Sequence, residues 1–288
     1  MSEFFVMNLL LADSGSTKTE WKVIQNGIPL ESLFSQGINP YFLETKQIIS
    51  ILKKEIQTIK NYEFDFVYFY GSGCNSESKN DVVERAISAF IKTKGIFIGS
   101  DLLGAARGLC QNEPGIACIM GTGSNSCYYD GIKIVSNVPP LGYILGDEGS
   151  AAVMGRKLLS AVLKKQVSPD IINRFDETYK LTRAEILENV YTKPLPNKFL
   201  GSFAKFISSN IEIPELQNIV TSSFDEFIIR NILQYPESYN LPVHFTGSVA
   251  FYFKTFLIEL LLMHHLKPGK ILLSPMEGLL KYHIENTQ

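Results

Sequence analysis

Residues 8–19 of the chain read NLLLADSGSTKT, an apolar run that ends on an aspartate and a turn of small residues. The run predicts a buried strand over Asn8–Asp13. In the turn, Gly15 lets the backbone approach a ligand closely, and Ser16, Thr17 and Thr19 add hydroxyl donors. Such a turn is suited to phosphate, and the aspartate at the strand end is suited to Mg²⁺, which prefers hard oxygen ligands.

The turn differs from a P-loop in two respects. The pattern G-x-x-x-x-G-K-[ST] is absent from the chain. The residues after the turn also predict a strand, whereas a P-loop opens a helix. Taken alone, the turn is equally consistent with a polar hairpin that binds nothing, so its interpretation depends on the rest of the chain.

A second turn of the same kind, GTGSN at residues 121–125, follows an apolar strand predicted over Gly115–Met120. Counted from Gly15 to Gly121, the two turns lie 106 residues apart (121 − 15). Each follows a buried strand and opens a hairpin, which indicates an internal duplication of half of the molecule. Because two facing turns can hold one polyphosphate between two domains, the pair is stronger evidence for a nucleotide site than either turn alone.

The first half of the chain predicts three antiparallel strands and then alternating helices and strands. The hairpin signal Asn26-Gly27 separates the second strand from the third. The predicted strands are Asn8–Asp13, Glu20–Gln25, Leu30–Phe34, Phe64–Tyr70 and Gly95–Ile98, and the predicted helices are Lys46–Lys60, Lys79–Lys92 and Leu102–Leu109. This order is typical of an α/β layer sandwich.

The second half repeats this beginning and then becomes helical. The predicted strands are Gly115–Met120, Ser126–Tyr129, Ile132–Ser136, Val243–Thr246 and Lys270–Leu273, and the predicted helices are Asp147–Lys165, Ala184–Tyr191, Phe199–Ile207, Leu216–Leu233, Val249–His264 and Met276–His283. We therefore expect two domains, residues 1–110 and 111–288, with a helical insertion at about residues 150–235 of the second.

The composition is that of an ordinary soluble globular protein, 45% hydrophobic and 19% charged. A formal net charge of −2 provides no basic field to attract nucleic acid or anionic lipid. The four cysteines form no CxxC pair, which favours reduced thiols and a reducing compartment. The apolar run near the N-terminus follows Glu3 and ends on Asp13 without a small-residue cleavage site, so we expect a strand, no membrane anchor and a cytoplasmic protein.

Three further features have both a chemical and a structural interpretation. Asp101, between a predicted strand and a predicted helix, is either a base for an attacking hydroxyl or a helix N-cap. In GDEGS at residues 146–150, Asp147 and Glu148 are either ligand contacts or the acidic first turn of a helix, and the flanking glycines favour contacts. TGS at residues 246–248 suits a nucleotide at a helix N-terminus, unless Ser248 is only an N-cap.

The chain resembles the N-acetylglucosamine kinase and BadF/BadG/BcrA/BcrD ATPase family, within the superfamily of actin, hexokinase and acetate kinase. The resemblance covers nearly the whole chain and rests on five motifs in the same order: Asp13–Thr19, Ser100-Asp101, Gly121–Asn125, Gly146–Ser150 and Thr246–Ser248. It implies the two-domain actin-like (ribonuclease H-like) ATPase fold, with a duplicated βββαβαβα core and extra helices in the second domain. It also implies that the last helix, at residues 276–285, packs back on the first domain.

The same resemblance implies a set of site residues. Asp101 matches the catalytic base, and Asp13 is the candidate Mg²⁺ ligand. The matched phosphate contacts are Gly15, Ser16, Thr17, Lys18 and Thr19 in the first turn and Gly121, Thr122, Gly123 and Ser124 in the second; the adenosine contacts are Gly247 and Ser248; the sugar contacts are Asn39, Ser72, Ser124, Asn125, Asp147 and Ala151.

These matches imply a sugar kinase that uses ATP and Mg²⁺, phosphorylates the 6-hydroxyl of N-acetylglucosamine or a related amino sugar, and forms a homodimer. One alternative is a BadF-type ATPase that activates a partner enzyme, which requires cysteines for an iron–sulfur cluster at a subunit interface. A second is a non-catalytic sugar sensor on the same fold, which would have lost the phosphate turns or the base. Cys118 and Cys127 show no cluster-like arrangement, and both turns and Asp101 are present, so the sequence favours the kinase.

Overall fold

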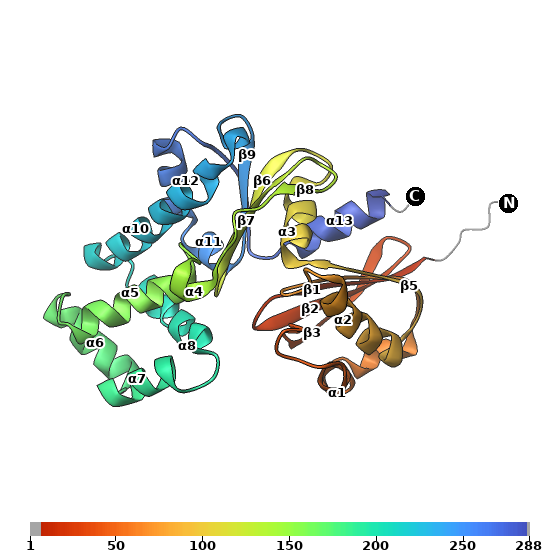
Figure 1. The fold of residues 1–288 in the computed structure, drawn as a ribbon, viewed down its shortest axis with the longest axis horizontal. Helices are drawn as coiled ribbons and strands as arrows, with labels where there is room; N and C mark the ends of the chain where they lie inside the picture. Colours follow the sequence, from red (N-terminus) through yellow and green to blue (C-terminus); the bar gives the residue numbers. More distant parts are fainter. Residues whose placement is uncertain (1–6, 287–288) are drawn as a thin grey trace. The chain divides into compact units, whose positions relative to one another are not determined.

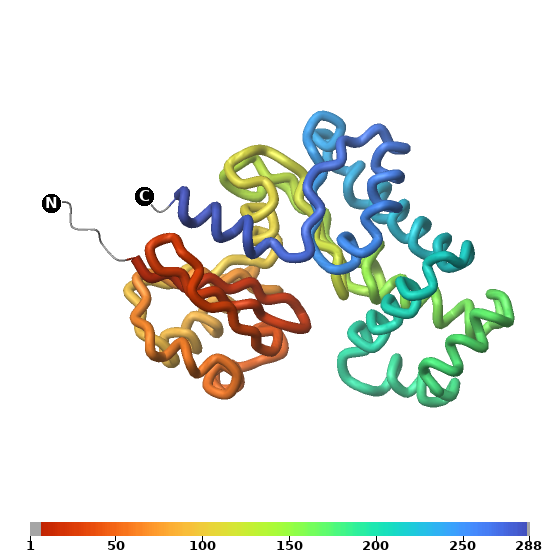
Figure 2. The backbone as a smooth tube through the Cα atoms, turned by 180° about the vertical axis from the view of Figure 1, so that it is seen from behind, coloured from red at the N-terminus to blue at the C-terminus, as the bar shows by residue number. Residues whose placement is uncertain are grey.

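The computed structural model describes residues 7–286, and the chain falls into two compact units (Figures 1 and 2). Unit 1 comprises the described residues up to Asn112 and those from Pro275 on, whereas unit 2 spans Glu113–Ser274. The chain therefore leaves unit 1 once and returns to it for its last helix. Residues 1–6, which include the beginning of the apolar N-terminal run, lie outside the described part.

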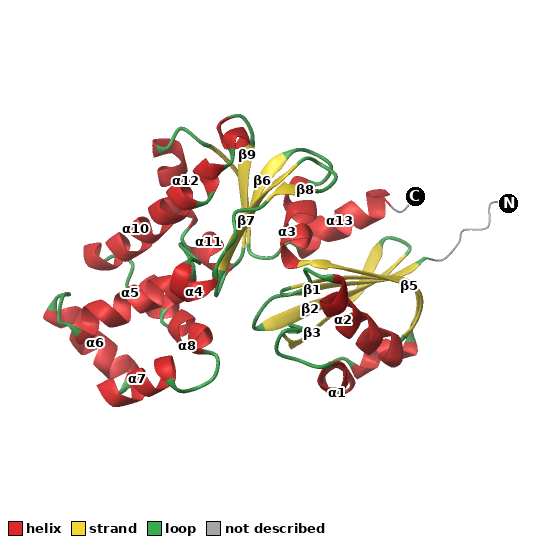
Figure 3. Cartoon of the chain, viewed as in Figure 1, coloured by secondary structure: helices red, strands yellow, loops and turns green. Residues whose placement is uncertain are grey.

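Unit 1 contains a five-stranded mixed sheet in the order β3-β2-β1-β4-β5 (Figure 3). β1, β2 and β3 are antiparallel, whereas β1, β4 and β5 are parallel. The elements in chain order are β1 (Asn8–Ser14), β2 (Lys18–Gln25), β3 (Ile28–Gln36), α1 (Thr45–Glu55), a 3₁₀ segment (Gln57–Asn61), β4 (Glu63–Gly71), α2 (Glu77–Phe90), β5 (Lys92–Ser100) and α3 (Asp101–Cys110). This is the expected βββαβαβα order.

β1 is buried on both faces, and its alternate side chains enter two different cores. Leu10 and Ala12 belong to the core that includes residues of α1 and α2. Leu9 and Leu11 belong to a second core that includes Met276 of the last helix. Because side chains of a strand alternate between faces, a strand covered on both faces is an unbroken apolar run, as residues 9–12 are.

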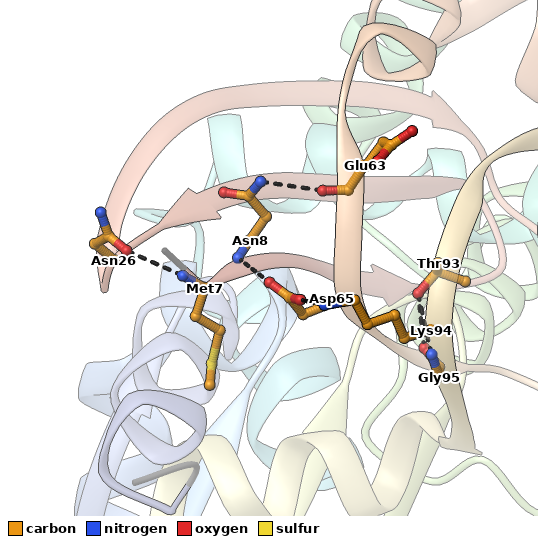
Figure 4. Close-up of polar contacts among 8 residues, drawn as sticks. All are labelled: Met7, Asn8, Asn26, Glu63, Asp65, Thr93, Lys94 and Gly95. Carbon is orange, nitrogen blue, oxygen red and sulfur yellow. Dashed lines mark hydrogen bonds and ion pairs between the residues drawn. The ribbon is translucent and has the colours of Figure 1, made fainter. Parts of the chain in front are cut away.

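Polar contacts fix the end of the sheet opposite the Gly15 turn (Figure 4). The backbone N–H of Asn8 donates to Asp65 Oδ2 at 2.8 Å, and Asn8 Nδ2 donates to the Glu63 carbonyl at 3.0 Å. Lys94 Nζ lies 2.6 Å from Asp65 Oδ1, and this hydrogen bond holds the pKa of Asp65 below its usual value. These contacts link β1, β4 and β5, so their register at the other end, where the candidate site lies, is fixed as well.

Unit 2 repeats the sheet topology of unit 1. Its strand order is β10-β9-β6-β7-β8, with β6, β7 and β8 antiparallel and β6, β9 and β10 parallel. Read from β8, this order corresponds strand by strand to 3-2-1-4-5. The strands are β6 (Gly115–Met120), β7 (Ser124–Tyr129), β8 (Ile134–Ser136), β9 (Pro242–Thr246) and β10 (Lys267–Leu272). The duplication inferred from the two small-residue turns is confirmed.

Helices supply most of the remaining core of unit 2. Between β8 and β9 they are α4 (Gly142–Leu145), α5 (Ala151–Leu163), α6 (Pro169–Tyr179), α7 (Arg183–Tyr191), α8 (Pro196–Ser202), α9 (Ala204–Ser209) and α10 (Pro214–Arg230), and after β9 they are α11 (Ser248–Tyr252) and α12 (Lys254–Met263). Over residues 7–286, no helix combines the length and the apolar character that a bilayer crossing requires.

Several helix boundaries differ from the sequence-based expectation. α5 begins at Ala151 after the N-cap Ser150, not at Asp147, whose φ of 53° is incompatible with a helix. The helix expected over Val249–His264 is two helices, interrupted at Phe253. The helix expected over Lys46–Lys60 ends as α-helix at Glu55 and continues as a 3₁₀ turn, and α6 was not expected at all.

The last helix, α13 (Met276–Asn286), packs against α3 within unit 1. A Cβ built on Gly278 would lie 1.9 Å from the carbonyl oxygen of Gly108, so only glycine permits this approach of the two backbones. Gln111 Nε2 also donates to the Gly278 carbonyl at 3.0 Å. The close crossing joins the end of the chain to the helix that begins at Asp101.

Candidate active site

The first small-residue turn leaves the end of β1 with its backbone exposed. Gly15 N–H donates to the Lys18 carbonyl at 3.0 Å, and residues 15–18 are exposed. Thr19 is different, because its hydroxyl is buried and lies 2.7 Å from Ser14 Oγ. The turn can therefore offer the hydroxyls of Ser16 and Thr17 to a ligand, whereas Thr19 fixes the base of the turn.

Contacts of Lys18 and Gly37 connect this turn to β3 and to the residues that follow it. Lys18 Nζ lies 4.8 Å from the centre of the Phe34 ring, so the cation is held on β3. A Cβ on Gly37 would lie 2.4 Å from the Gly15 carbonyl oxygen, so the residues that follow β3 pack directly on the turn. The exposed part of the turn is thus supported from one side.

Three parallel strands of unit 1 end together and bring Asp13, Ser72 and Asp101 to one edge of the sheet. In the register, Ser14 pairs with Gly71, and Gly71 pairs with Ser100. Ser72 and Asp101 directly follow the paired residues Gly71 and Ser100, and Ser72 hydrogen bonds to the Asp101 carboxylate. Asp13 pairs with Tyr70, at the end of the same strand β4. The candidate metal ligand, the candidate base and one candidate sugar contact therefore lie within one unit.

The two carboxyl groups at this edge have raised pKa values. The pKa of Asp13 is raised to about 7, chiefly by burial and also by the charges of Asp101 and Glu20, whereas Lys18 lowers it. Burial also raises the pKa of Asp101, against hydrogen bonds from the backbone N–H of Leu102 and from Ser72. A pair of carboxylates this poorly solvated is stabilised by a cation or by sharing a proton.

Asp101 does not serve as the helix N-cap. The cap of α3 is Ser100, whose Oγ accepts a hydrogen bond from Leu103 N–H at 3.1 Å. Asp101 is the first residue of the helix instead. The interpretation of this residue as a helix N-cap is therefore wrong. Its carboxylate is available to contact a ligand or to accept a proton.

Asn39 lies beside the Ser72 loop. Its Oδ1 accepts a hydrogen bond from Tyr41 N–H at 2.9 Å, which leaves the Nδ2 group to act as a donor. A Cβ on Gly73, whose φ is +83°, would lie 2.4 Å from Asn39 Oδ1, so the two loops pack against each other. Lys79 holds the Asn39 loop from below by donating to the Pro40 carbonyl at 3.0 Å.

In unit 2 the second small-residue turn supports the start of α5. Gly121 N–H donates to the Gly123 carbonyl at 2.9 Å, and the Gly121 carbonyl accepts from Ala151 N–H at 2.9 Å. The Thr122 carbonyl accepts from Ala152 N–H at 3.2 Å. No atom lies within 4 Å of a Cβ built on Gly121, so its surface is open to a ligand.

The Gly247-Ser248 turn lies next to this second turn. A Cβ on Gly247, which has a φ of +115°, would lie 2.3 Å from the Met120 carbonyl oxygen. Gly247 is itself the N-cap of α11 and Ser248 the first helical residue, so the interpretation of Ser248 as a side-chain N-cap is wrong. Ser248 is exposed. The preceding hydroxyl, Thr246 Oγ1, is buried and has no hydrogen-bond partner in the described chain.

Asp147 and Glu148 form a loop that precedes α5 and have separate roles. Burial raises the pKa of Asp147 to about 6, against a hydrogen bond from the Ser124 N–H at 3.4 Å. Glu148 is buried, with Arg230 Nη1 at 3.0 Å from its Oε1 and Asn231 Nδ2 at 3.3 Å from its Oε2. Asp147 can thus bind a ligand, whereas Glu148 braces the loop.

The remaining sugar candidates of unit 2 lie around this loop. Ser124 is buried and its Oγ donates to the Glu148 carbonyl at 2.7 Å, so its hydroxyl supports the loop. Ala151 is buried at the start of α5 and can offer only a methyl group. Asn125 is half-buried on β7, with Oδ1 hydrogen-bonded to Ser126 N–H at 2.9 Å.

Three residues that contact this loop or Asn125 were not predicted from the sequence: Arg230, Asn231 and Asn137. Arg230 and Asn231 contact Glu148 across more than 80 positions of the chain. Asn137 Nδ2 lies 2.9 Å from Asn125 Oδ1. None of them stands in a motif, so no local pattern could have identified them.

The donor set of unit 1 suits Mg²⁺ better than a softer metal. The described residues contain no group of three or more His, Cys, Asp or Glu side chains placed to hold a metal ion. Mg²⁺ requires only one or two carboxylates, since phosphate oxygens and water complete its shell. The poorly solvated carboxylate of Asp13 fits such a ligand.

Comparison with known proteins places the chain in a family. A protein of Porphyromonas gingivalis, named as a candidate N-acetylglucosamine kinase, is 43% identical with a TM-score of 0.94, over 97% of this chain and 100% of that one. The chain belongs to the N-acetylglucosamine kinase family. This family consists of carbohydrate kinases on the actin-like fold, and the fold expected from the sequence is confirmed.

More distant structures share the fold alone. A candidate N-acetylglucosamine kinase of Chromobacterium violaceum is 17% identical with a TM-score of 0.73, over 96% of this chain and 99% of that one. A ROK-family glucokinase of Streptomyces griseus, solved with glucose and AMPPNP, is 12% identical with a TM-score of 0.57, over 96% and 97%. A scan against models of protein families and a search of curated proteins found no match.

Proposed function

We propose that the protein transfers the γ-phosphoryl group of ATP to the 6-hydroxyl of N-acetylglucosamine or a related amino sugar. The observation that carries the proposal is the position and environment of the Asp101 carboxylate. Its carboxylate is half-buried, is not needed as a helix cap, and has a raised pKa beside Asp13. Family membership supports the same class of reaction.

Asp101 would accept the proton of the attacking hydroxyl. A base is more effective when its pKa lies closer to the working pH, and burial moves Asp101 in that direction. The hydrogen bond from Ser72 and the Leu102 N–H orient the carboxylate. Because the transition state of phosphoryl transfer demands little covalent chemistry, orientation of the hydroxyl contributes more than basicity.

The nucleotide phosphates would be bound by the exposed turn at residues 15–18 and by the open turn at Gly121–Gly123. Backbone N–H groups in glycine-containing turns bind phosphate oxygens well. When bound, Mg²⁺ neutralises part of the phosphate charge, and Asp13 is the residue proposed to hold it. The turn at Gly247, with the exposed Ser248 that follows it, would approach the adenosine.

On the sugar, the proposed contacts are Asn39 and Ser72 of unit 1 and Asn125 and Asp147 of unit 2. Asn39 offers a donor and Asp147 an acceptor, which is the mixture that hydroxyl groups require. We also propose that the protein is cytoplasmic and forms a homodimer; light scattering on the purified protein would test the dimer.

The experiment is an ADP-release assay with a panel of amino sugars, together with the variant Asp101→Asn. We expect sugar-dependent turnover that falls about 10²–10⁴-fold in the variant, with ATP binding retained. The matched control is Asp81→Asn, which changes a half-exposed carboxylate on α2 that is paired with Arg85. A 6-deoxy analogue should bind without being phosphorylated. Equal ATP turnover with and without every amino sugar would contradict the proposal.

A further inference from the structure

Asn137 lies in an exposed segment after β8, and its side-chain amide has an unambiguous orientation. Its Nδ2 lies 2.6 Å from the Ser126 carbonyl oxygen and 3.1 Å from the Val138 carbonyl oxygen. Carbonyl oxygens only accept hydrogen bonds, so the group that faces them must be the NH₂ donor. The third atom within reach of this NH₂ is Oδ1 of Asn125, at 2.9 Å.

The orientation of Asn137 determines the orientation of Asn125. Two donors, Asn137 Nδ2 and the Ser126 N–H, point at the same atom of the Asn125 amide, each at 2.9 Å. Only an oxygen can accept both, so Oδ1 faces inward. Within residues 7–286, Asn125 Nδ2 has no hydrogen-bond acceptor, and the half-buried side chain offers it as a donor.

Tyr235 holds the two segments that carry these amides together. It is buried, its Oη donates to the Ser126 carbonyl at 3.0 Å, and it accepts from the Val138 N–H at 2.8 Å. Burial raises the pKa of Tyr235 to about 12, so the hydroxyl keeps its proton near neutral pH. The position of Asn137 relative to β7 is therefore set by a buried bridge as well as by its own amide.

We infer that Asn137 is a positioning residue for the sugar site: it fixes the Asn125 amide so that this position presents a hydrogen-bond donor to an oxygen of the ligand. The inference rests on the proposed function for the identity of the ligand as a sugar. It specifies that the ligand group opposite Asn125 is an acceptor, either a hydroxyl or a carbonyl oxygen. Without Asn137 one of the two donors that select this orientation is lost, and the amide can rotate to present Oδ1.

The test is a double-mutant cycle of Asn125→Ala and Asn137→Ala, with Asn189→Ala as the control. Asn189 is another asparagine of unit 2, whose Nδ2 donates to a backbone carbonyl on α7. Calorimetry without nucleotide gives the Kd for the sugar. Steady-state kinetics give kcat and the KM values for the sugar and for ATP. We expect Asn137→Ala to weaken sugar binding about three- to tenfold, the worth of one hydrogen bond, with kcat and ATP KM changed less than about twofold. In the Asn125→Ala background, the same change should have almost no further effect.

Asn125→Asp gives an independent check that leaves Asn137 in place. Its carboxylate still accepts from Asn137 and Ser126, but it replaces the outward donor by an acceptor. A ligand carbonyl would then face a second acceptor, and sugar binding should weaken more than in Asn125→Ala, whereas a ligand hydroxyl can turn to donate and the loss should be smaller. Additive effects in the cycle, or sugar binding unchanged by Asn137→Ala, would overturn the inference. A wild-type protein that binds amino sugars without phosphorylating them would contradict the proposed kinase activity and leave the cycle in the binding data to decide the role of Asn137.

Discussion

Tyr70 Oη lies 2.9 Å from Nε2 of His283, a residue 213 positions later in the chain. Tyr70 is on β4 and His283 on α13. Arg107 Nη1 also donates to this tyrosine oxygen at 2.7 Å, and since a guanidinium can only donate, the imidazole is the one of these two partners that can accept the tyrosine proton. His283 is thereby an acceptor at Nε2, and its ring stacks on Tyr68 with 3.8 Å between centroids.

The first prediction is that this contact stabilises unit 1. Replacing the buried ring in His283→Ala removes the stacking and leaves the Tyr70 hydroxyl without its acceptor, which should lower the free energy of unfolding by about 2–4 kcal/mol. Tyr70→Phe keeps the ring volume and should cost less, about 1–3 kcal/mol. Urea unfolding of both variants measures this. Two variants as stable as the wild type would show that α13 is not held here.

The second prediction concerns acid stability. Burial, with the nearby Arg107 charge, lowers the pKa of His283 to about 3 from an ordinary 6.5. Between these two values the unfolded chain binds more protons at this residue than the folded chain, so stability falls as the pH falls below 6.5. The slope contributed by one such residue is at most about 1.4 kcal/mol per pH unit.

The variant His283→Gln tests the acid effect, because glutamine can still accept from Tyr70 and does not titrate. We expect its unfolding free energy to fall less steeply between pH 6.5 and 4 than that of the wild type. His244 is a second buried histidine, with its pKa lowered to about 4, so part of the slope should persist. The control is His265→Asn, a change at an exposed histidine. Identical pH profiles of His283→Gln and the wild type would refute the assignment.

Local sequence pattern was sufficient to predict the two sheets. The strand at residues 8–14 was predictable because it is covered on both faces and therefore continuously apolar. The Asn26-Gly27 turn was predictable because its residues must adopt positive φ, here 52° and 76°. Asp13 and Asp101 could each be singled out because the first stands near the end of a predicted strand and the second directly after one.

Contacts between distant segments were not predictable in this way. The start of α5 was placed too early because Asp147 and Glu148 suit a helix N-terminus by charge. In the structure Asp147 has a positive φ, and Ser150 is the N-cap of the helix. The role of Ser124 as a support of that loop depends on a bond across 24 positions. The residues next to such partners in the sequence carry no pattern that identifies the contact.

The third prediction compares the contribution of Glu148 to the sugar site with that of its ion-pair partner Arg230. Arg230 has a largely exposed side chain, so losing its ion pair in Arg230→Ala should cost at most about 1 kcal/mol and raise the sugar KM less than about threefold. Glu148→Ala also leaves the buried amide of Asn231 without its acceptor, at a cost of about 1–3 kcal/mol.

Because Glu148 adjoins Asp147, we expect Glu148→Ala to raise the sugar KM about tenfold, the equivalent of about 1.4 kcal/mol, with the ATP KM unchanged. Steady-state kinetics with each substrate varied in turn measure this. An equal rise in the ATP KM would show that the loop serves the nucleotide and not the sugar.

The fourth prediction uses two glycines of unit 2 that differ in their surroundings. Gly247→Ala would force a Cβ to within 2.3 Å of the Met120 carbonyl oxygen at a φ of +115°, which should lower the unfolding free energy by about 3 kcal/mol. In Gly121→Ala the added methyl meets no atom within 4 Å and should change the free energy of unfolding by less than about 0.5 kcal/mol.

If the Gly121 turn binds phosphate by close backbone approach, however, the added methyl should raise the ATP KM at least about tenfold. Urea unfolding and ATP kinetics of the two variants decide between a structural and a ligand-binding glycine. A stable Gly121→Ala protein with the wild-type ATP KM would exclude this turn from the nucleotide site, whatever happens at Gly247.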